Sequence, residues 1–356
     1  MDNQAFQAPR CADHIPDTDE WTLKAERRSL RKTSNELGLF ILLYFLLMHW
    51  ICAVAVNNVV ESGIVTLENS LLLQFFIQMI GAVAAPLLAG LVYKIMSRRK
   101  ISAYLPKSHV PLQTLVPLVM IGLAAAIIAN NIAGLFDSNI SLFRLKNSAS
   151  QFTETKSIPE MVMYAVSVAI VPAFAEEFAF RGIVMGVLRK YGDAFAIIAS
   201  SVMFGAMHGN TTQIFFAFVL GLIFAFADCK ANSIVPSVII HFFNNFYSVL
   251  LDIMRTNLNW DNAMLSVVRL GIMVSFCLLG IFSYLYFSNT DRRFFRVSNK
   301  DPNAFSSTDV LSLKPKMYIF FTSVGVIISL CLFLWKTVYY LLPLDIQQMI
   351  PNWMIL

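Results

Sequence analysis

The stretch VMYAVSVAIVPAFAEEFAFRGIVMG, residues 162–186, is an apolar segment that contains two adjacent carboxylates and an arginine. It is long enough to cross a lipid bilayer as a helix. Because hydrocarbon makes ionisable side chains costly, Glu176, Glu177 and Arg181 need partners or a function. The stretch therefore predicts a transmembrane helix with a polar site inside the membrane.

The rest of the chain supports a membrane protein. Of its 356 residues, 57% are hydrophobic and 14% are charged, against roughly 25% charged residues in an ordinary soluble domain. Apolar stretches that could span a bilayer occupy 37–59, 71–93, 112–135, 159–190, 194–208, 213–228, 233–251, 264–287 and 317–342. The sequence predicts an all-α polytopic protein with about nine transmembrane helices, of which 194–208 and 213–228 are short for complete spans.

The predicted organisation has four parts. A polar cytosolic tail, 1–36, has no early apolar stretch of the kind found in secretory signals. N-terminal transmembrane helices follow over 37–158, and a four-helix core over 159–251 contains the charged stretch. C-terminal transmembrane helices occupy 252–356, with a polar cytosolic linker at 288–316.

The basic residues predict the orientation of the chain in the membrane. Placing the N-terminus in the cytoplasm puts most of the 27 Lys and Arg residues on that side, as the positive-inside rule requires. The basic residues on the other side are then Arg144, Lys146, Lys156, Arg255 and Arg269. We expect a multi-pass protein of the cell membrane. We interpret its net charge of +5 as a consequence of membrane topology that also favours contact with anionic lipid. Nothing in the sequence indicates nucleic acid as a partner.

Several polar or reactive residues are expected to serve packing. The five cysteines, Cys11, Cys52, Cys229, Cys277 and Cys331, are widely spaced and lack a CxxC pair, which indicates free thiols. His49 has no evident ionisable partner in its span and is interpreted as an interfacial or packing residue. Asn130, Asn131 and Asn244 are interpreted as helix-contact residues.

The ionisable residues inside the spans form a cluster. Apart from His49, they are Glu176, Glu177, Arg181, His208 and His241. Glu177 and Arg181 are four residues apart, which favours an ion pair on one helix face. Glu176 points about 100° away and is left for another task. Gly182 and Gly186 permit close helix approach, and Pro172 removes the backbone hydrogen bond to Val168 and should kink the helix.

Helix geometry brings the remaining polar residues to a similar depth. Glu176 and His208 both lie about 21 Å from the cytoplasmic ends of their helices, at 1.5 Å per residue. His241 and Asn245 are four residues apart on one face of a later helix. These four side chains are therefore expected to converge in one intramembrane cavity that opens toward the cytoplasm.

Glutamate, histidine and asparagine side chains together suit the hydrolysis of an amide. A buried glutamate can act as a general base on water, and histidine and asparagine can stabilise an oxyanion. The alternative is a zinc site with Glu176, His208 and His241 as ligands, since three protein ligands and a water are usual in catalytic zinc sites. The HExxH motif of many zinc proteases is absent, and the sequence leaves open whether the cofactor is zinc or none.

Three motifs in order resemble those of a known family. EEFAFRG (Glu176, Glu177, Arg181), FGAMH (Phe204, His208) and HFFNN (His241, Asn245) are similar to the EExxxR, FxxxH and HxxxN motifs of the CPBP family of intramembrane proteases, also called Abi. That family includes the endopeptidase that removes the last three residues of prenylated CAAX proteins, and bacterial members linked to bacteriocin maturation or self-immunity.

The resemblance implies a role for each matching residue. Glu176 with His208 would activate water, and His241 with Asn245 would form the oxyanion hole. Glu177 and Arg181 would support the first helix, and Phe204 would shape the cavity beside His208. The family is often described as metalloproteases, although a metal-free glutamate mechanism suits these residues.

Two other classes of function remain open on the sequence. Buried Glu and His residues also mark proton-coupled transporters, but no second copy of the Glu176 region indicates the internal repeat common among them. A membrane scaffold or self-immunity protein could retain the pocket for binding alone. For a peptidase, we expect a membrane-associated or hydrophobic peptide or protein substrate, because a site at this depth excludes folded soluble proteins.

Overall fold

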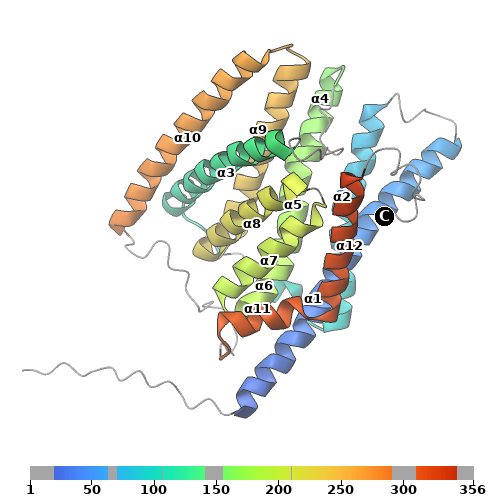
Figure 1. The fold of residues 1–356 in the computed structure, drawn as a ribbon, viewed down its shortest axis with the longest axis vertical. Coiled ribbons are helices and arrows are strands. Elements are labelled where there is room, and N and C mark those ends of the chain that lie inside the picture. Colours follow the sequence, from blue (N-terminus) through green and yellow to red (C-terminus); the bar gives the residue numbers. More distant parts are fainter. Residues whose placement is uncertain are drawn as a thin grey trace, which may run out of the picture.

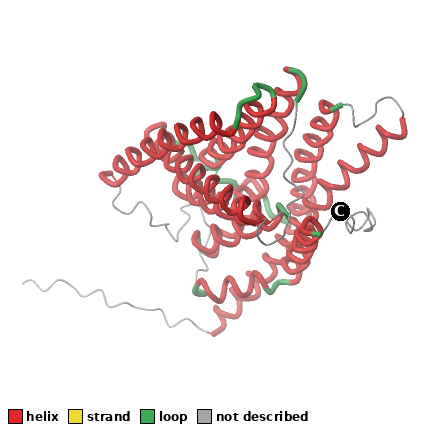
Figure 2. The backbone as a smooth tube through the Cα atoms, turned by 45° about the horizontal axis from the view of Figure 1, so that its top comes forward, coloured by secondary structure: helices red, strands yellow, loops and turns green. Residues whose placement is uncertain are grey.

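The computed structural model describes residues 20–62, 70–106, 108–140, 155–209, 211–290 and 310–342. This part of the chain forms helices joined by short loops and contains no β-strand (Figures 1 and 2). Eight of the helical segments are long and apolar enough to cross a membrane. The predicted all-α polytopic fold is therefore confirmed.

The spans are built from the following elements. Before the charged stretch come α1 (Glu20–Ser62), α2 (Leu71–Ser97), η2 (Ile101–Ala103) and α3 (Leu112–Ile140). The fourth span, Ile158–Tyr191, is a continuous helical segment made of α4 (Ile158–Ala165), η4 (Val166–Ile170), α5 (Val171–Glu177), η5 (Phe178–Met185), α6 (Gly186–Leu188) and η6 (Arg189–Tyr191). After it come α7 (Asp193–Met207), α8 (Thr211–Ala231), α9 (Val235–Thr256), α10 (Asn262–Thr290), α11 (Leu313–Phe321) and α12 (Val324–Leu341).

The first helix begins earlier than the sequence suggested. Residues 20–36 belong to the same 43-residue helix as the first span, rather than to a separate tail. Glu26 is buried at this end, and its Oε2 accepts the backbone N–H groups of Val310 and Leu311 at 2.9 and 2.8 Å. This contact with a distant segment accounts for the helical extension. Residues 1–19 and most of the predicted linker, 291–309, lie outside the described residues.

The two helices expected to be short differ from each other. Helix α7 has 15 residues, about 22 Å at 1.5 Å per residue, which is too short for about 30 Å of hydrocarbon. Helix α8 has 21 residues, about 31 Å, so the prediction that it would be short was wrong. The structure thus has eight candidate spans and one short buried helix among the described residues.

The last predicted span, 317–342, is divided into two helices. Helix α11 ends at Phe321, and the backbone at Ser323 is extended (φ −77°, ψ 135°) before α12 begins. Figure 1 shows α11 lying across the end of the bundle, whereas α12 runs along the bundle. Only α12 is therefore a candidate span.

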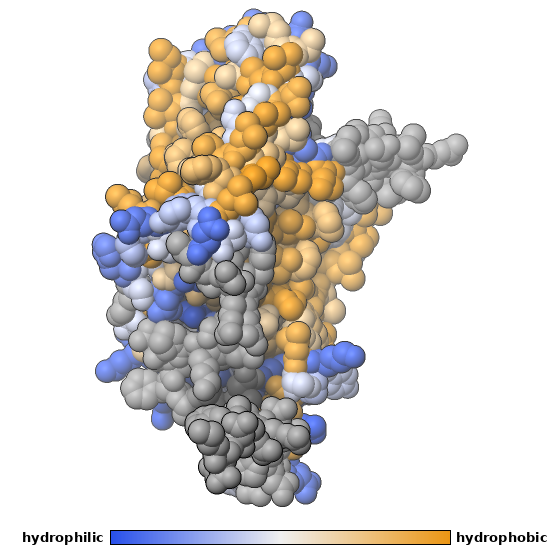
Figure 3. All heavy atoms as spheres, turned by 90° about the vertical axis from the view of Figure 1, so that its left-hand side faces the viewer, coloured by the Kyte–Doolittle hydropathy of each residue, from blue (hydrophilic) through white to orange (hydrophobic). Residues whose placement is uncertain are grey.

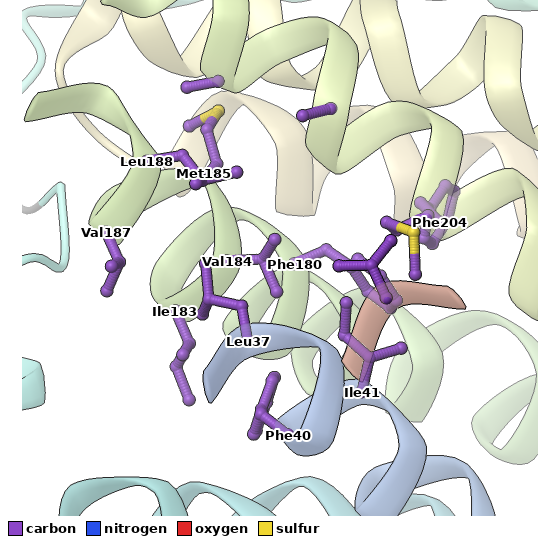
Figure 4. Close-up of a cluster of buried hydrophobic side chains, with 14 of the residues drawn as sticks. Leu37, Phe40, Ile41, Phe180, Ile183, Val184, Met185, Val187, Leu188 and Phe204 are labelled. Carbon is purple, nitrogen blue, oxygen red and sulfur yellow. The ribbon is translucent and has the colours of Figure 1, made fainter. Parts of the chain in front are cut away.

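The main hydrophobic core surrounds α7 and the second half of the fourth span. Figure 4 shows Leu37 and Ile41 of α1 beside Phe180 and Val184 of η5, with Phe204 of α7 nearby. The side chains of Phe180 and Val184 are completely buried. Many large hydrophobic side chains are also exposed on the exterior. On the face drawn in Figure 3, hydrophobic residues cover broad areas and hydrophilic residues form smaller patches. A surface of this kind suits a lipid environment.

Close packing at two glycines fixes the second half of the fourth span against the turn after α2. A Cβ atom at Gly186 would lie 2.4 Å from the carbonyl oxygen of Tyr104, and one at Gly182 would lie 2.6 Å from Leu105 Cδ2. The close approach expected at these two glycines is therefore present, but its partner is the turn at 104–105 rather than another helix. This contact positions the helix that carries Glu176 and Glu177.

Candidate active site

The predicted ion pair between Glu177 and Arg181 is present and fully buried. Arg181 Nε lies 3.1 Å from Glu177 Oε2, and both side chains have no exposed surface. Arg181 also donates a hydrogen bond to the carbonyl oxygen of Gly221 at 3.3 Å. Its guanidinium lies 4.4 Å from the ring centre of Phe204, a cation–π contact that is strong where water is excluded. The pair therefore links the fourth span to α7 and α8.

Glu177 has a second contact that the sequence analysis missed. Its Oε1 lies 2.8 Å from His241 Nδ1. Because a carboxylate accepts hydrogen bonds, Nδ1 carries the proton, and the other ring nitrogen, Nε2, lies 4.0 Å from Glu176 Oε2. His241 also stacks on Phe224 with ring centres 5.1 Å apart. Glu177 thus fixes the orientation of a candidate catalytic histidine as well as supporting its own helix.

His208 lies at the end of a helix that stops within the bundle. It directly follows α7, and its Nδ1 donates to the carbonyl oxygen of Phe204 at 2.9 Å. Gly209 then adopts a left-handed conformation (φ 63°), which favours glycine. Since Nδ1 is occupied, Nε2 is the nitrogen that remains available to a substrate or water. The shortness of α7 therefore explains how a histidine reaches the middle of the molecule.

Asn245 is held by a backbone irregularity in the fourth span. Pro172 has no N–H to donate to the carbonyl oxygen of Val168, as the sequence indicated. Instead, Asn245 Nδ2 donates to that oxygen at 2.9 Å. The neighbouring turn, Val166–Ile170, is π-helical, and such turns often occur at functional sites. One N–H of the Asn245 amide remains for a ligand.

A chain of amides extends behind Asn245. Asn244 Nδ2 donates to Asn245 Oδ1 at 3.1 Å, and Asn130 Nδ2 donates to Asn244 Oδ1 at 2.7 Å. The sequence analysis interpreted Asn130 and Asn244 only as helix contacts. The partners show that they also fix which way the Asn245 amide points.

One cavity of about 370 Å³ brings the candidate residues together. Its lining includes Glu176, Phe204, His208, His241 and Asn245. The side chain of Glu176 is 20% exposed, whereas that of Glu177 is completely buried. The adjacent acids therefore differ as the helix geometry suggested: Glu176 faces the cavity and Glu177 lies behind it with Arg181.

The geometry does not favour the alternative of a metal site. In the part of the chain that the structure describes, no group of three or more His, Cys, Asp and Glu side chains is arranged so that it could hold a metal ion. Glu176, His208 and His241 are therefore not placed as zinc ligands.

Outside the cavity, the prediction for His49 was wrong and the prediction for the described cysteines was confirmed. His49 has an ionisable partner after all: Lys336 Nζ donates to His49 Nε2 at 2.8 Å, and the lysine also lies 4.7 Å from the ring centre of Phe45. The interpretation of His49 as lacking such a partner was wrong, because that partner comes from the distant helix α12. Cys52, Cys229, Cys277 and Cys331 are free thiols, as expected, and Cys11 lies outside the described residues.

Comparison with known proteins identifies the segment that contains the cavity. Residues 158–247 match the family model described as Rce1-like, type II CAAX prenyl endopeptidase. No curated protein and no solved structure gives a significant match. The matched segment contains Glu176, Glu177, Arg181, Phe204, His208, His241 and Asn245. Residues 158–247 of this chain are therefore similar to the Rce1-like type II CAAX prenyl endopeptidases, consistent with the resemblance to the CPBP intramembrane proteases.

Proposed function

We propose that this protein is an intramembrane endopeptidase that hydrolyses a peptide bond through a water molecule activated by Glu176. The observation that carries the proposal is the single cavity lined by Glu176, His208, His241 and Asn245 within the segment that matches the Rce1-like family. In this proposal, Glu176 and His208 activate the water, and His241 and Asn245 stabilise the negative charge that develops on the substrate.

Glu176 and His208 act on the water. Glu176 is the accessible acid of the pair, and His208 presents Nε2 because its Nδ1 is bonded to Phe204. Glu176 removes a proton from the water as its oxygen attacks the carbonyl carbon of the substrate. The same proton is then delivered to the nitrogen of the leaving amine as the C–N bond breaks. The products are an amine and a carboxylic acid, which then loses its proton.

Asn245 and His241 stabilise the negative charge that develops on the carbonyl oxygen. Asn245 offers the second N–H of its amide, the first being bonded to Val168. His241 donates through Nε2, which requires a proton on both ring nitrogens, and Glu177 accepts the other one. Such donors are fixed before the reaction and need no reorganisation.

The substrate is a membrane-associated or hydrophobic peptide or protein. The cavity lies among membrane-spanning helices, so an extended segment reaches it from the cytoplasmic side or from the lipid. The type II CAAX prenyl endopeptidase description of the matched family supports a cut near a lipid-modified terminus. In a bacterial source, a leader peptide, bacteriocin precursor or membrane regulator is the corresponding substrate. We also propose that the protein lies in the cell membrane with its N-terminus in the cytoplasm, because most of its basic residues then lie on the cytoplasmic side.

The Glu176→Ala variant separates this proposal from a binding scaffold and from a transporter. We expect native membranes containing the variant to accumulate uncut substrate that co-purifies with it, identified by mass spectrometry. The matched control is Glu160→Gln, an acid at the opposite end of the same span that lies outside the cavity. Cleavage that is unchanged in Glu176→Ala would overturn the role given to Glu176. Membranes with the wild-type chain that show no more cleavage than membranes without it would overturn the enzyme assignment in favour of a scaffold or transporter.

A further inference from the structure

A cationic pocket lies at one end of the molecule, apart from the peptidase cavity. It is formed where the start of α1 meets α11, and its volume is about 560 Å³. The residues that line it are Arg27, Arg28, Arg31, Lys32, Pro315, Tyr318 and Ile319. Four of these seven residues are basic, and none of them has a role in the proposed hydrolysis.

Hydrogen bonds and an ion pair hold together the two helices that form the pocket. Lys316 Nζ donates to the carbonyl oxygen of Tyr191 at 2.7 Å and lies 3.7 Å from Glu26 Oε1. Arg31 Nη1 donates to the carbonyl oxygen of Thr322 at 2.9 Å. These contacts tie α11 to α1 on the inner side and at the rim. The depression between the two helices is therefore part of the folded structure.

The positive charge of the pocket is poorly neutralised by the protein. Glu26, the acid on this part of α1, is buried and accepts N–H groups of Val310 and Leu311 on the inner side. Lys32 Nζ lies 3.9 Å from Glu36 Oε1. Among the described residues, however, no carboxylate lies within ion-pair distance of Arg27, Arg28 or Arg31. Several guanidinium and ammonium groups around one hollow favour an anion that accepts many hydrogen bonds, above all a phosphate.

The pocket lies at the boundary between the polar end of the molecule and its apolar exterior. Helix α11 runs across the end of the bundle (Figure 1), and Tyr318 on it is 70% exposed. Aromatic side chains of this kind are enriched at the level of lipid headgroups. Farther along α1 and on α12, the apolar side chains of Leu39, Val324 and Ile328 are exposed.

We propose that this pocket binds the phosphate group of an anionic phospholipid, with the lipid chains lying along the exposed apolar side chains of α1 and α12. A lipid fits better than a soluble phosphate because the basic hollow is next to an apolar exterior, so that one ligand can satisfy both. It fits better than an acidic peptide because Tyr318, which lines the hollow, and the exposed apolar side chains farther along α1 and on α12 offer contacts to a lipid. The proposal is independent of the peptidase activity.

The test uses the purified full-length chain in detergent and in nanodiscs. Binding of phosphatidylglycerol is measured by native mass spectrometry and compared with that of phosphatidylcholine. The pocket variant is Arg27→Gln/Arg28→Gln/Lys32→Gln, which leaves the structural residue Arg31 in place. The matched control is Lys94→Gln/Arg98→Gln/Lys100→Gln, which removes the same charge from exposed residues at the end of α2.

We expect phosphatidylglycerol to bind the wild-type chain more tightly than phosphatidylcholine. Since each basic residue near anionic lipid contributes about fivefold in affinity, the pocket variant should bind about 100-fold more weakly and the control much less so. Equal weakening in both variants, or equal binding of the two lipids by the wild type, would overturn the proposal. Full displacement of the lipid by millimolar inorganic phosphate or by an acidic peptide would overturn the choice of a lipid.

A second measurement does not depend on the folding of any variant. A photoreactive phosphatidylglycerol analogue is cross-linked to the wild-type protein in nanodiscs, and the modified peptides are identified. The proposal predicts adducts within 27–32 and 315–319. Adducts spread over all basic loops, without enrichment in these two segments, would contradict it.

Discussion

Glu176 and Glu177 are adjacent in the chain, and the helix gives them different environments. Glu176 faces the cavity, whereas Glu177 is buried between Arg181 and His241. The pairing of Glu177 with Arg181 could be predicted from their spacing alone. Its contact with His241 could not, because the register between the fourth span and α9 depends on tertiary packing. The same reason explains why the links from Asn130 to Asn244 and from Lys336 to His49 were missed.

The Glu177 contacts lead to a prediction with two substitutions. Glu177→Ala leaves Arg181 buried without its carboxylate, and removing one partner of a buried ion pair costs about 3–5 kcal/mol. This variant should therefore show a large loss of thermal stability. Glu177→Gln keeps the size of the side chain and should fold better, but with lower kcat because His241 loses its orientation. Wild-type kcat in a folded Glu177→Gln protein would show that the contact is structural only.

The amide chain leads to a graded prediction. Asn245→Ala should lower kcat by about 10²–10³-fold, the typical effect of losing one oxyanion donor. Asn244→Ala removes a hydrogen bond of about 1 kcal/mol that orients Asn245, so kcat should fall by about fivefold with little change in KM. Steady-state kinetics on the purified variants distinguishes the two effects. The account of the amide chain fails if Asn244→Ala raises KM and leaves kcat unchanged.

At the scale of the elements, the apolar stretches predicted where the helices lie. They did not predict where a helix is interrupted or extended, which only the structure shows. The approximate position of each candidate span follows from hydropathy. The break between α11 and α12 lies inside an apolar run, and the continuity of α1 depends on the buried Glu26, which hydropathy does not indicate. The π-helical turns around Pro172 could be suspected only as a kink. These irregularities place the polar groups of the candidate site.

Gly186 tests the packing of the fourth span. A methyl group there would lie 2.4 Å from the carbonyl oxygen of Tyr104, which is backbone and cannot move freely. Gly186→Ala should destabilise the protein by about 1–3 kcal/mol, as overpacking does, and lower its melting temperature. Gly271→Ala in α10 is the control, since nothing lies within 4 Å of its added Cβ. Equal melting temperatures of the two variants would argue against this close contact.

At the scale of the whole molecule, the distribution of basic residues leads us to expect the N-terminus in the cytoplasm. The turn between α9 and α10 contains Trp260 and lies at the opposite end of the bundle from the basic turn after α2 (Figure 1). We therefore expect a reporter inserted after residue 260 to be extracytoplasmic. A phosphatase active only outside the cytoplasm should give high activity there, and a fusion after residue 100 low activity. The reverse pattern would invert the proposed topology.

The most direct test of the central claim is peptide hydrolysis by the purified, metal-depleted protein in nanodiscs, with and without Glu176. The wild-type chain should cleave hydrophobic peptides after exhaustive chelation, because the proposed mechanism uses a glutamate-activated water. Glu176→Gln should show no cleavage at an unchanged melting temperature, and His208→Ala and His241→Ala should also be inactive. Full activity of Glu176→Gln, or wild-type activity that is lost on chelation and restored by zinc, would contradict the account.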